Sequence, residues 1–482
     1  MARISHPPAL PLYEPRELFR MPVSYLPSQI DGGAFTTPLN FRDSPFQLLW
    51  ADIKLVASLL LWIPHIFLPL KTTSSYSELY PSWMNMRDLA LHVILGTLGT
   101  IFLLIVVPLV IAAPGVASAV FVLLCCGIVW ACCIPLRAKT KVLNSKASLD
   151  EVDVRPEEAW VFVNGVTAGE HWLQANIDLL SLIFKRPVVG IHNRTYGVVF
   201  DLMECLVQRC FSYSTDSTRI TYRHLKSVLQ DQKITRVVCV AHSQGGIILA
   251  TALDSLFADV PSGSFDKLEI YTFGCAANHF NNPARFVPPP HASGPSNATT
   301  LPQHRTPPEV GLIRHIEHYA NEHDFVSRFG VLHFTRDKLS NRFVGKVFEN
   351  KGHGGHLMNQ HYLSRMFMAE SSEFLDQVVD IDEDTAILRD EATGKQGGVD
   401  IEPTNIIAGA PAVDQGAGPP GRETSSSVAG VVRGETPESH AGGAGDWDHA
   451  EEYRRSLQAQ RGKTVRDLSR LWKYKGGGLP KD

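Results

Sequence analysis

Ser243 stands where a serine side chain could act as a nucleophile. It lies in the stretch "VVCVAHSQGGIILATAL" (237–253), between a run of β-branched residues and a run rich in alanine and leucine. A strand that turns sharply into a helix here would expose the hydroxyl group and aim the next backbone N–H, on Gln244, at a developing oxyanion. Such a corner needs small neighbours, and Ala241 and Gly245 meet that need. The alternative is a tight turn with a purely structural role.

An activated serine also needs an acid and a base, which segments further along the chain could supply. A serine hydroxyl is a weak nucleophile until a histidine, itself oriented by a carboxylate, accepts its proton. In folds with this kind of strand-to-helix corner, the acid and then the histidine follow the serine along the chain. The segment "NEHDFVSRFG" (321–330) offers Asp324, which follows a predicted strand, with Glu322 as the alternative.

The Gly-rich segment "ENKGHGGHLMNQHYL" (349–363) carries the candidate histidines. His356 lies at the entrance to a predicted helix and is the favoured base, while His353 lies three residues earlier on the same loop. His361 would fall inside the helix, where a packed or solvated side chain is more common. His242 lies beside the serine, and because adjacent residues at such a corner point apart, we expect it to pack locally.

Strand and helix patterns alternate between residues 155 and 370, which predicts an α/β domain with a mostly parallel, doubly wound sheet. Short apolar runs alternate with amphipathic stretches, as in right-handed βαβ units with helices on both faces. Ligands of such sheets collect at the carboxyl ends of the strands, so the residues after each strand are candidates for chemistry. The predicted strands are 159–163, 187–191, 236–240, 268–274, 313–320 and 342–348, and the predicted helices are 171–184, 197–211, 219–231, 246–257 and 358–370.

With a serine, an aspartate and a histidine at three successive strand ends, the chain resembles the α/β-hydrolase superfamily, particularly its lipase- and esterase-like serine hydrolases. The resemblance covers about residues 155–370, and Ala241 replaces the glycine that is usual two residues before the serine. It implies that Ser243 is the nucleophile, His356 the general base and acid, and Asp324 the orienting carboxylate. This chemistry requires no metal and no organic cofactor.

The resemblance also implies a second oxyanion donor, on the loop after an early strand, to act with the N–H of Gln244. That loop is "VNGVTAG" (163–169), in which Asn164 takes the place of the usual histidine and the N–H of Val166 is the expected donor. The long Pro-rich connection 279–312 stands where enzymes of this kind often carry a mobile lid, although a surface loop is the simpler interpretation.

Two apolar runs upstream predict a transmembrane helical hairpin over residues 89–136. Residues 89–113 and 116–136 each have the length that a bilayer-crossing helix needs, roughly 20 residues. The Pro114–Gly115 pair between them cannot continue a helix and suits a very short turn.

Basic residues at the two ends of the hairpin predict its orientation. Arg87 precedes the first run, and the second run is followed by Arg137, Lys139, Lys141 and Lys146, whereas the turn carries no charge. The positive-inside rule therefore places both ends, and the α/β domain with them, in the cytosol. The sequons at Asn193 and Asn297 would then carry no glycan.

The segments before the hairpin are harder to assign. Residues 1–20 contain no apolar core of a signal peptide, and we expect residues 1–53 to form a cytosolic segment. Within 54–71, the stretch "LVASLLLWIPHIFLPL" is short and contains two prolines. This composition favours an interfacial or re-entrant segment over a third span.

The tail after the α/β domain divides into two parts. Residues 371–446 include a long stretch rich in Gly, Ala, Pro, Ser and Thr, which predicts a largely disordered linker. Residues 447–473 regain helical spacing with interleaved arginines and lysines. They are expected to form a basic amphipathic helix that lies on an anionic membrane surface, or else a solvated helix within the tail.

Composition narrows the possible functions. The net charge of −4 gives no field that would attract nucleic acid, and the eight cysteines form neither a disulfide framework nor a zinc-binding pattern. The resemblance to serine hydrolases and the predicted membrane hairpin together imply a hydrolase of an internal membrane, such as the endoplasmic reticulum, that cleaves a lipid or other hydrophobic acyl ester. The alternatives are a thioesterase or acyltransferase that uses the same residues, and a catalytically silent membrane scaffold.

Overall fold

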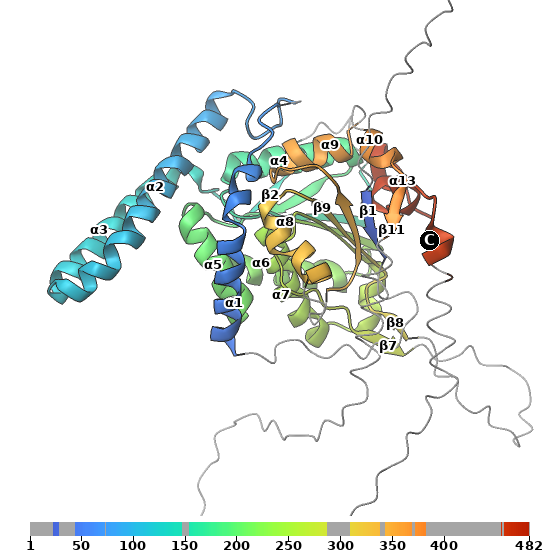
Figure 1. Cartoon of the computed structure of the whole chain (residues 1–482). Coiled ribbons are helices and arrows are strands. Elements are labelled where there is room, and N and C mark those ends of the chain that lie inside the picture. Colours follow the sequence, from blue (N-terminus) through green and yellow to red (C-terminus); the bar gives the residue numbers. More distant parts are fainter. Residues whose placement is uncertain are drawn as a thin grey trace, which may run out of the picture.

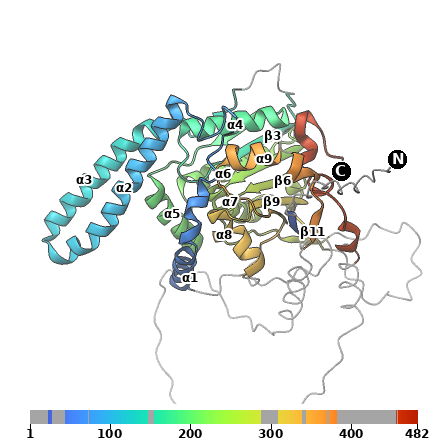
Figure 2. The ribbon, with the colours of Figure 1, turned by 45° about the horizontal axis from the view of Figure 1, so that its top comes forward.

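A mostly parallel β-sheet with helices on both faces is the core of the computed structural model (Figure 1). The structure describes residues 23–27, 44–72, 74–146, 154–286, 309–337, 343–368, 372–381, 455 and 457–481. In these residues the sheet has nine strands, in the order β11-β1-β10-β9-β6-β5-β3-β4-β2. A helical hairpin projects from one side of this domain (Figure 2). The α/β class predicted from the sequence is confirmed.

Six central strands run parallel to one another. Their bounds are β3 Glu158–Val163, β4 Val188–Ile191, β5 Arg236–His242, β6 Leu268–Phe273, β9 His315–Asn321 and β10 Lys346–Asn350. β4 lies on one side of β3, whereas β5 and every later central strand lie on the other. The order of strands therefore reverses between β3 and β5, and crevices for ligands open at such a switch point.

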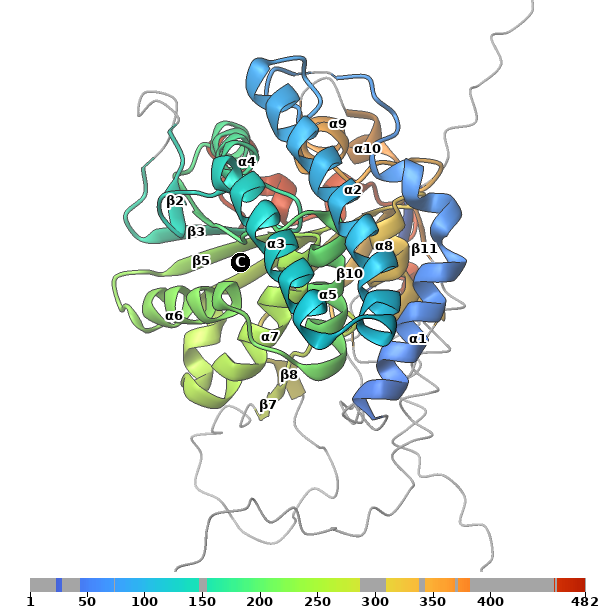
Figure 3. The same ribbon diagram turned by 90° about the vertical axis from the view of Figure 1, so that its left-hand side faces the viewer.

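Alternation along each strand separates two apolar layers. Val161 and Val163 of β3 face the layer that contains helices α6 (Asp216–Gln230) and α7 (Gln244–Asp259). Trp160 and Phe162 face the opposite layer, beneath α4 (Glu170–Phe184) and the segment from Met358 onward. α5 (Val198–Phe211) lies between the domain and the projecting hairpin (Figure 3).

The hairpin is formed by α2 (Trp83–Ala112) and α3 (Gly115–Cys133), with a turn at Pro114. Both helices are long and apolar enough to cross a membrane, and the apolar run of the second continues to Leu136. The prediction of two such helices is confirmed. α2 begins six residues earlier than predicted because Ser82 caps it, accepting a hydrogen bond from Asn85 N.

The apolar stretch at 54–71 does not form a straight helix. α1 (Pro45–Ser58) and a 3₁₀ helix (Leu60–Ile66) meet at an angle of 71°. Only the two helices together are long and apolar enough to cross a membrane. The buried Asp52 of α1 forms a 2.9 Å ion pair with Arg209 of α5. This pair fixes α1 to the α/β domain.

Three short strands that the sequence did not predict complete the sheet. β1 (Val23–Leu26) pairs antiparallel with β10, although residues 1–53 were expected to stay outside the domain. β11 (Val379–Ile381), after the short helix α10 (Ser372–Asp376), pairs with β1 inside the expected disordered linker. β2 (Val142–Asn144) pairs with β4. Strands of three or four residues depend on distant partners, so their local sequence carries little signal.

The C-terminal segment also differs from the prediction of one helix over 447–473. Its described residues are helical at 455 and 457–460, as predicted, and then form the short helices α13 (Val465–Leu468) and η8 (Leu471–Gly477), which pack against the second apolar layer. Arg466 and Arg470, two of the basic residues expected to face a membrane, form ion pairs with Asp376 and Glu269. The exposed Asp376 and the buried Glu269 thus hold this segment against the domain, and residues 447–454 lie outside the described part.

Smaller differences concern the end of the domain. The strand predicted at 342–348 is β10, which begins four residues later and ends two residues later; Gly345, directly before it, has a φ of +127°. The helix predicted at 358–370 is a π-helical turn, Met358–Leu363, followed by a short α-helix, α9 (Ser364–Met366). In the connection 279–312, β7 (Ala284–Phe286) pairs with β8 (Glu309–Gly311). The rest of this candidate lid, 287–308, lies outside the described residues.

Candidate active site

Ser243 occupies the sharp corner between β5 and α7 that its sequence predicted. Its φ is +58° and its ψ −126°, a conformation that a residue with a side chain rarely adopts. The corner is held by hydrogen bonds from Ser243 N to Phe273 O and from Ala276 N to Ser243 O, 3.0 and 3.1 Å long. Backbone strain of this kind persists only where surrounding contacts enforce it, and it clusters at functional sites.

The small residues around the corner are required by close packing. A Cβ atom at Gly245 would lie 2.2 Å from the carbonyl oxygen of Val163, and one at Gly246 would lie 2.3 Å from Cys275 Sγ. Ala241 is fully buried in the first apolar layer. Gly245 therefore lets the N-terminus of α7 lie against the end of β3, and Gly246 lets it lie against Cys275, which follows β6.

His356 and Asp324 are brought together from the loops after β10 and β9. His356 Nδ1 donates a 2.8 Å hydrogen bond to Asp324 Oδ2. Gly274, directly after β6, makes room for both side chains, since a Cβ there would lie 2.9 Å from the imidazole and 3.0 Å from the carboxylate. The imidazole therefore lies at the same edge of the sheet as Ser243.

The second imidazole nitrogen, His356 Nε2, is buried and has no hydrogen-bond partner among the described residues. No hydrogen bond joins it to Ser243 Oγ within the described part of the chain. Catalytic hydrogen bonds are often long in ligand-free enzymes and tighten when substrate binds. A nitrogen that is oriented by a carboxylate and otherwise unoccupied is suited to accept a proton.

Asp324 is ionised and heavily hydrogen-bonded. Burial alone would raise the pKa of its carboxyl group, but the charge and hydrogen bond of His356, with further hydrogen bonds from Tyr362 and Val326 N, outweigh burial and lower the pKa. Tyr362 Oη and Ser327 Oγ donate to Oδ2 across 2.6 and 2.9 Å. Asp324 caps the N-terminus of a short helix, α8 (Phe325–Phe329), and Ser327 lies three residues after it. This spacing is the only signal in the sequence that could have indicated the hydrogen bond between Ser327 and Asp324.

The competing candidates point elsewhere. Glu322 accepts a 2.7 Å hydrogen bond from Gly352 N, and the half-buried His353 donates from Nδ1 to its neighbour Lys351 O. His361 uses both ring nitrogens, accepting from Leu357 N and donating to the carbonyl oxygen of Pro69. Their hydrogen bonds are thus made away from the Asp324 carboxylate.

His242, the residue before the serine, packs locally as expected. Its ring stacks on that of His356 with centroids 4.6 Å apart, and its Nε2 donates to the backbone oxygen of His356. Burial, with the nearby charge of His356, lowers the pKa of His242 to about 3. It therefore stays neutral and supports one side of the His356 ring.

The loop after β3 touches the serine. A Cβ atom at Gly165 would lie 2.4 Å from Ser243 Cβ, so only glycine fits at this position. Val166, one expected oxyanion donor, follows Gly165 in this loop. Gln244, the other expected donor, follows Ser243 and is the first residue of α7. A helix N-terminus presents unpaired N–H groups and partial positive charge, which suit a developing oxyanion.

Asp201 of α5 anchors this loop, although the sequence did not single it out. Its carboxylate accepts hydrogen bonds from Thr167 N at 3.0 Å, Tyr196 N at 2.8 Å and Thr195 Oγ1 at 2.6 Å. It thereby joins the loop after β3 to the loop after β4. Burial raises the pKa of Asp201 to about 6, because these hydrogen bonds only partly offset the cost of burying a charge.

We expect Asp201→Asn to lower kcat for ester hydrolysis by about 10- to 100-fold with little change in KM, since a misplaced oxyanion donor acts mainly on the transition state. The amide offers one acceptor oxygen where the carboxylate offers two. Steady-state kinetics on the full chain, with the exposed Asp254→Asn on α7 as the control, tests this expectation. An equal loss in both variants would contradict it.

A buried network also surrounds the side chain of Gln244. Gln244 Oε1 accepts a 2.6 Å hydrogen bond from Asn193, and its Nε2 donates to Glu204 and Gln208. Asn193 is itself buried, and its backbone N–H donates to Asn164 Oδ1 across 2.6 Å. The Asn193 sequon is therefore inaccessible in the folded domain, and Asn297 lies outside the described residues.

The segment between α1 and α2 covers the histidine loop. His356 N donates to Ile66 O across 2.9 Å, and Gln360 Nε2 donates to Pro69 O. The buried carboxylate of Glu78 accepts from the N–H groups of Asn359 and Gln360, and burial raises the pKa of Glu78 to about 7. The apolar stretch at 54–71 thus packs on the candidate site itself.

Among the described residues, no cluster of three or more histidine, cysteine or acidic side chains is arranged to hold a metal ion. A scan against models of protein families finds no match to this chain, and a search among curated proteins finds no similar sequence.

Proposed function

We propose that the chain is a membrane-anchored serine hydrolase of the α/β-hydrolase superfamily that cleaves a lipid or other hydrophobic acyl ester. The observation that carries this proposal is the His356–Asp324 pair at 2.8 Å, at the same sheet edge as a serine whose backbone φ is +58°. The switch point between β3 and β5, which is the expected place for a ligand, supports it. α2 and α3 would provide the anchor.

The proposed reaction has two steps. Ser243 Oγ attacks the acyl carbonyl carbon while His356 Nε2 accepts its proton, and the N–H groups of Gln244 and Val166 stabilise the oxyanion. The intermediate collapses, the C–O bond to the alcohol breaks, and His356 returns the proton to the leaving alcohol. Water, deprotonated by His356, then attacks the acyl-enzyme and releases the carboxylic acid and Ser243.

The positions of the basic residues favour a cytosolic domain on an internal membrane. Arg87, Arg137 and Lys141 flank the ends of the two apolar helices, and their turn at Pro114–Gly115 carries no charge. A glycan at Asn297 would contradict this orientation.

A fluorophosphonate probe tests the function directly, because it phosphonylates an activated serine and no ordinary one. We expect labelling of the full-length protein, loss of labelling in Ser243→Ala, and unchanged labelling in Ser255→Ala, which alters an exposed serine of the same helix. Absence of labelling in the wild type would favour a silent scaffold. Labelling without net hydrolysis of esters in water would favour acyl transfer to another acceptor.

A further inference from the structure

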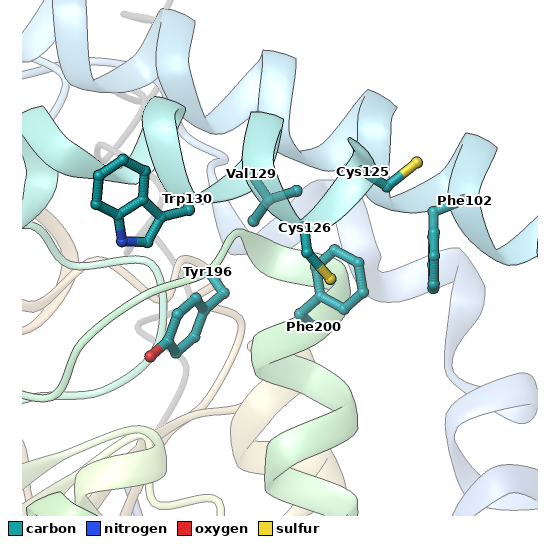
Figure 4. A pocket seen from close by; sticks show the side chains of 7 residues that line it. All are labelled: Phe102, Cys125, Cys126, Val129, Trp130, Tyr196 and Phe200. Carbon is teal, nitrogen blue, oxygen red and sulfur yellow. The ribbon is translucent and has the colours of Figure 1, made fainter. Parts of the chain in front are cut away.

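An apolar cleft lies between the membrane hairpin and the α/β domain, away from the residues assigned to catalysis. Its volume is about 330 Å³, within the range of small-ligand sites. The wall on the hairpin comes from α2 and α3, and the wall on the domain comes from α5 and the loop before it (Figure 4). The residues that line it are Phe102, Cys125, Cys126, Val129, Trp130, Tyr196 and Phe200.

The lining favours a hydrocarbon occupant. No lining residue carries a formal charge, and Figure 4 shows the Tyr196 hydroxyl directed away from α3. Phe102 and Phe200 meet across the cleft with ring centroids 5.6 Å apart. Water in such a space would lack the polar partners that retain buried water, whereas a hydrocarbon chain loses nothing by entering.

The surroundings of the cleft indicate where such an occupant comes from. α5 packs so closely on α2 that a Cβ at Gly99 would lie 2.9 Å from Val199. Beyond this contact, α5 exposes large apolar side chains, and Phe211 at its end meets the exposed Phe46 of α1 at 5.6 Å. The exposed apolar residues of α5 are Val198, Met203, Val207 and Phe211. An apolar face thus continues from the hairpin across α5 to α1, as expected of a surface that touches the bilayer.

The domain wall of the cleft is formed by residues that neighbour the candidate active site in the sequence. Tyr196 lies three residues after Asn193, whose side chain donates to Gln244. Three residues span at most about 11 Å, so Tyr196 cannot be further than that from Asn193, measured between Cα atoms. Phe200 directly precedes Asp201, which holds the loop that touches Ser243. The domain wall of the cleft is therefore continuous in the chain with the residues that contact Gln244 and the loop beside Ser243.

We propose that this cleft binds one hydrocarbon chain of a bilayer lipid ester and that the ester group reaches Ser243 from the membrane side, past residues 193–197. The second half of this proposal rests on the proposed hydrolase function. According to the cleft proposal, the substrate is a long-chain lipid ester that enters laterally from the bilayer. Tyr196 and Phe200 bind its hydrocarbon chain.

Photocrosslinking tests the binding site without requiring catalysis. Full-length Ser243→Ala protein is placed in phosphatidylcholine vesicles that contain a phosphatidylcholine with a diazirine near the end of one acyl chain, and adducts are mapped by mass spectrometry after irradiation. We expect adducts concentrated at residues 125–130 and 196–200. Val129→Trp, which fills the cleft, should reduce them about tenfold, the order expected when a bulky side chain occupies the ligand's space.

Leu124→Trp is the matched control, because Leu124 is an exposed residue about half a turn from Cys126 on the same helix. It should leave the adduct pattern unchanged. Cys126→Phe fills the cleft from a second position, so the test does not depend on the folding of a single variant. The melting temperature of each variant shows whether it is folded. Adducts spread evenly over the apolar face, or adducts that survive both cleft-filling changes in folded protein, would overturn the proposal.

The two proposals fail in distinguishable ways. Fluorophosphonate labelling of wild-type Ser243 without cleft adducts would reject the cleft and leave the hydrolase. Cleft adducts without labelling of Ser243 would support the lipid site and reject the hydrolase. If both hold, Val129→Trp should reduce hydrolysis of long-chain esters in vesicles more than Leu124→Trp does.

Discussion

His356→Ala is expected to lower kcat for ester hydrolysis by about 1,000-fold or more, since removal of the base from a serine triad leaves only the contribution of binding and the oxyanion donors. The proposed role of this imidazole depends on Asp324, which accepts from Nδ1 at 2.8 Å and so directs Nε2 away from the carboxylate. His353→Ala is the matched control. It removes another imidazole from the same loop, where Nδ1 already donates to Lys351 O.

The same reasoning predicts the effect of the carboxylate. Asp324→Asn should reduce kcat by up to about 10,000-fold, because an amide cannot orient the imidazole as the ionised carboxylate does. Both variants should still bind substrate, so kcat falls while KM changes little. Steady-state kinetics of full-length protein in detergent or vesicles gives both constants. Loss of activity in His353→Ala, with activity retained in His356→Ala, would show that His353 and not His356 is the general base.

The sequence predicted those parts of the candidate site that depend on neighbouring residues. The corner at Ser243 has a local signature, because the strand, the small residues and the helix follow one another within 17 residues. Asp324 and His356 were found by their positions after strands, which the alternation of apolar runs predicted. The structure places both side chains in one hydrogen-bonded pair, and their catalytic role remains the subject of the kinetic test.

The parts that were missed depend on contacts between distant segments. Asp201 looks like an ordinary helical acid in the sequence, yet it receives donors from the loops after two different strands. Tyr362 lies 38 residues after Asp324, and nothing in its neighbourhood marks the hydrogen bond that it donates. Glu78 binds the N–H groups of residues more than 280 positions away. Such pairings follow from tertiary packing, on which local patterns carry no information.

The C-terminal segment was misassigned for a related reason. Interleaved arginines and apolar residues indicate amphipathicity, but the pattern does not say whether the basic face meets a membrane or the protein itself. Arg470 shows the second outcome, since its Nε and Nη2 atoms donate to Glu269 Oε1 at 3.0 and 2.9 Å. Both side chains are nearly fully buried. A buried charge of this kind needs a partner of opposite charge.

Arg470→Ala is therefore expected to destabilise the folded domain by about 3 kcal/mol, the lower end of the usual cost of removing one member of a buried ion pair, because Arg236 stays 3.6 Å from Glu269. Glu269 would keep the phenol groups of Tyr271 and Tyr474, each of which donates to Oε2 at 2.7 Å, and the guanidinium of Arg236, 3.6 Å from Oε1. The backbone of the segment is fixed at the same place, because Arg470 N donates to Glu317 at 2.8 Å. Denaturant unfolding of the full chain in detergent, followed by aromatic circular dichroism, measures the change.

Lys473→Ala, at an exposed position of the same segment, is the control and should change stability by less than about 0.5 kcal/mol. Replacing both charged residues, as in Arg470→Met with Glu269→Gln, should recover part of the lost stability, because neither member of the pair is then left as a charge without the other. Glu269 is the second residue of β6, whereas Ser243 follows the carboxyl end of the parallel strand β5. The two sites thus lie at opposite edges of the sheet, so kcat per folded molecule should be unchanged. A large loss of kcat in folded Arg470→Ala protein would show instead that the C-terminal segment acts on the catalytic edge.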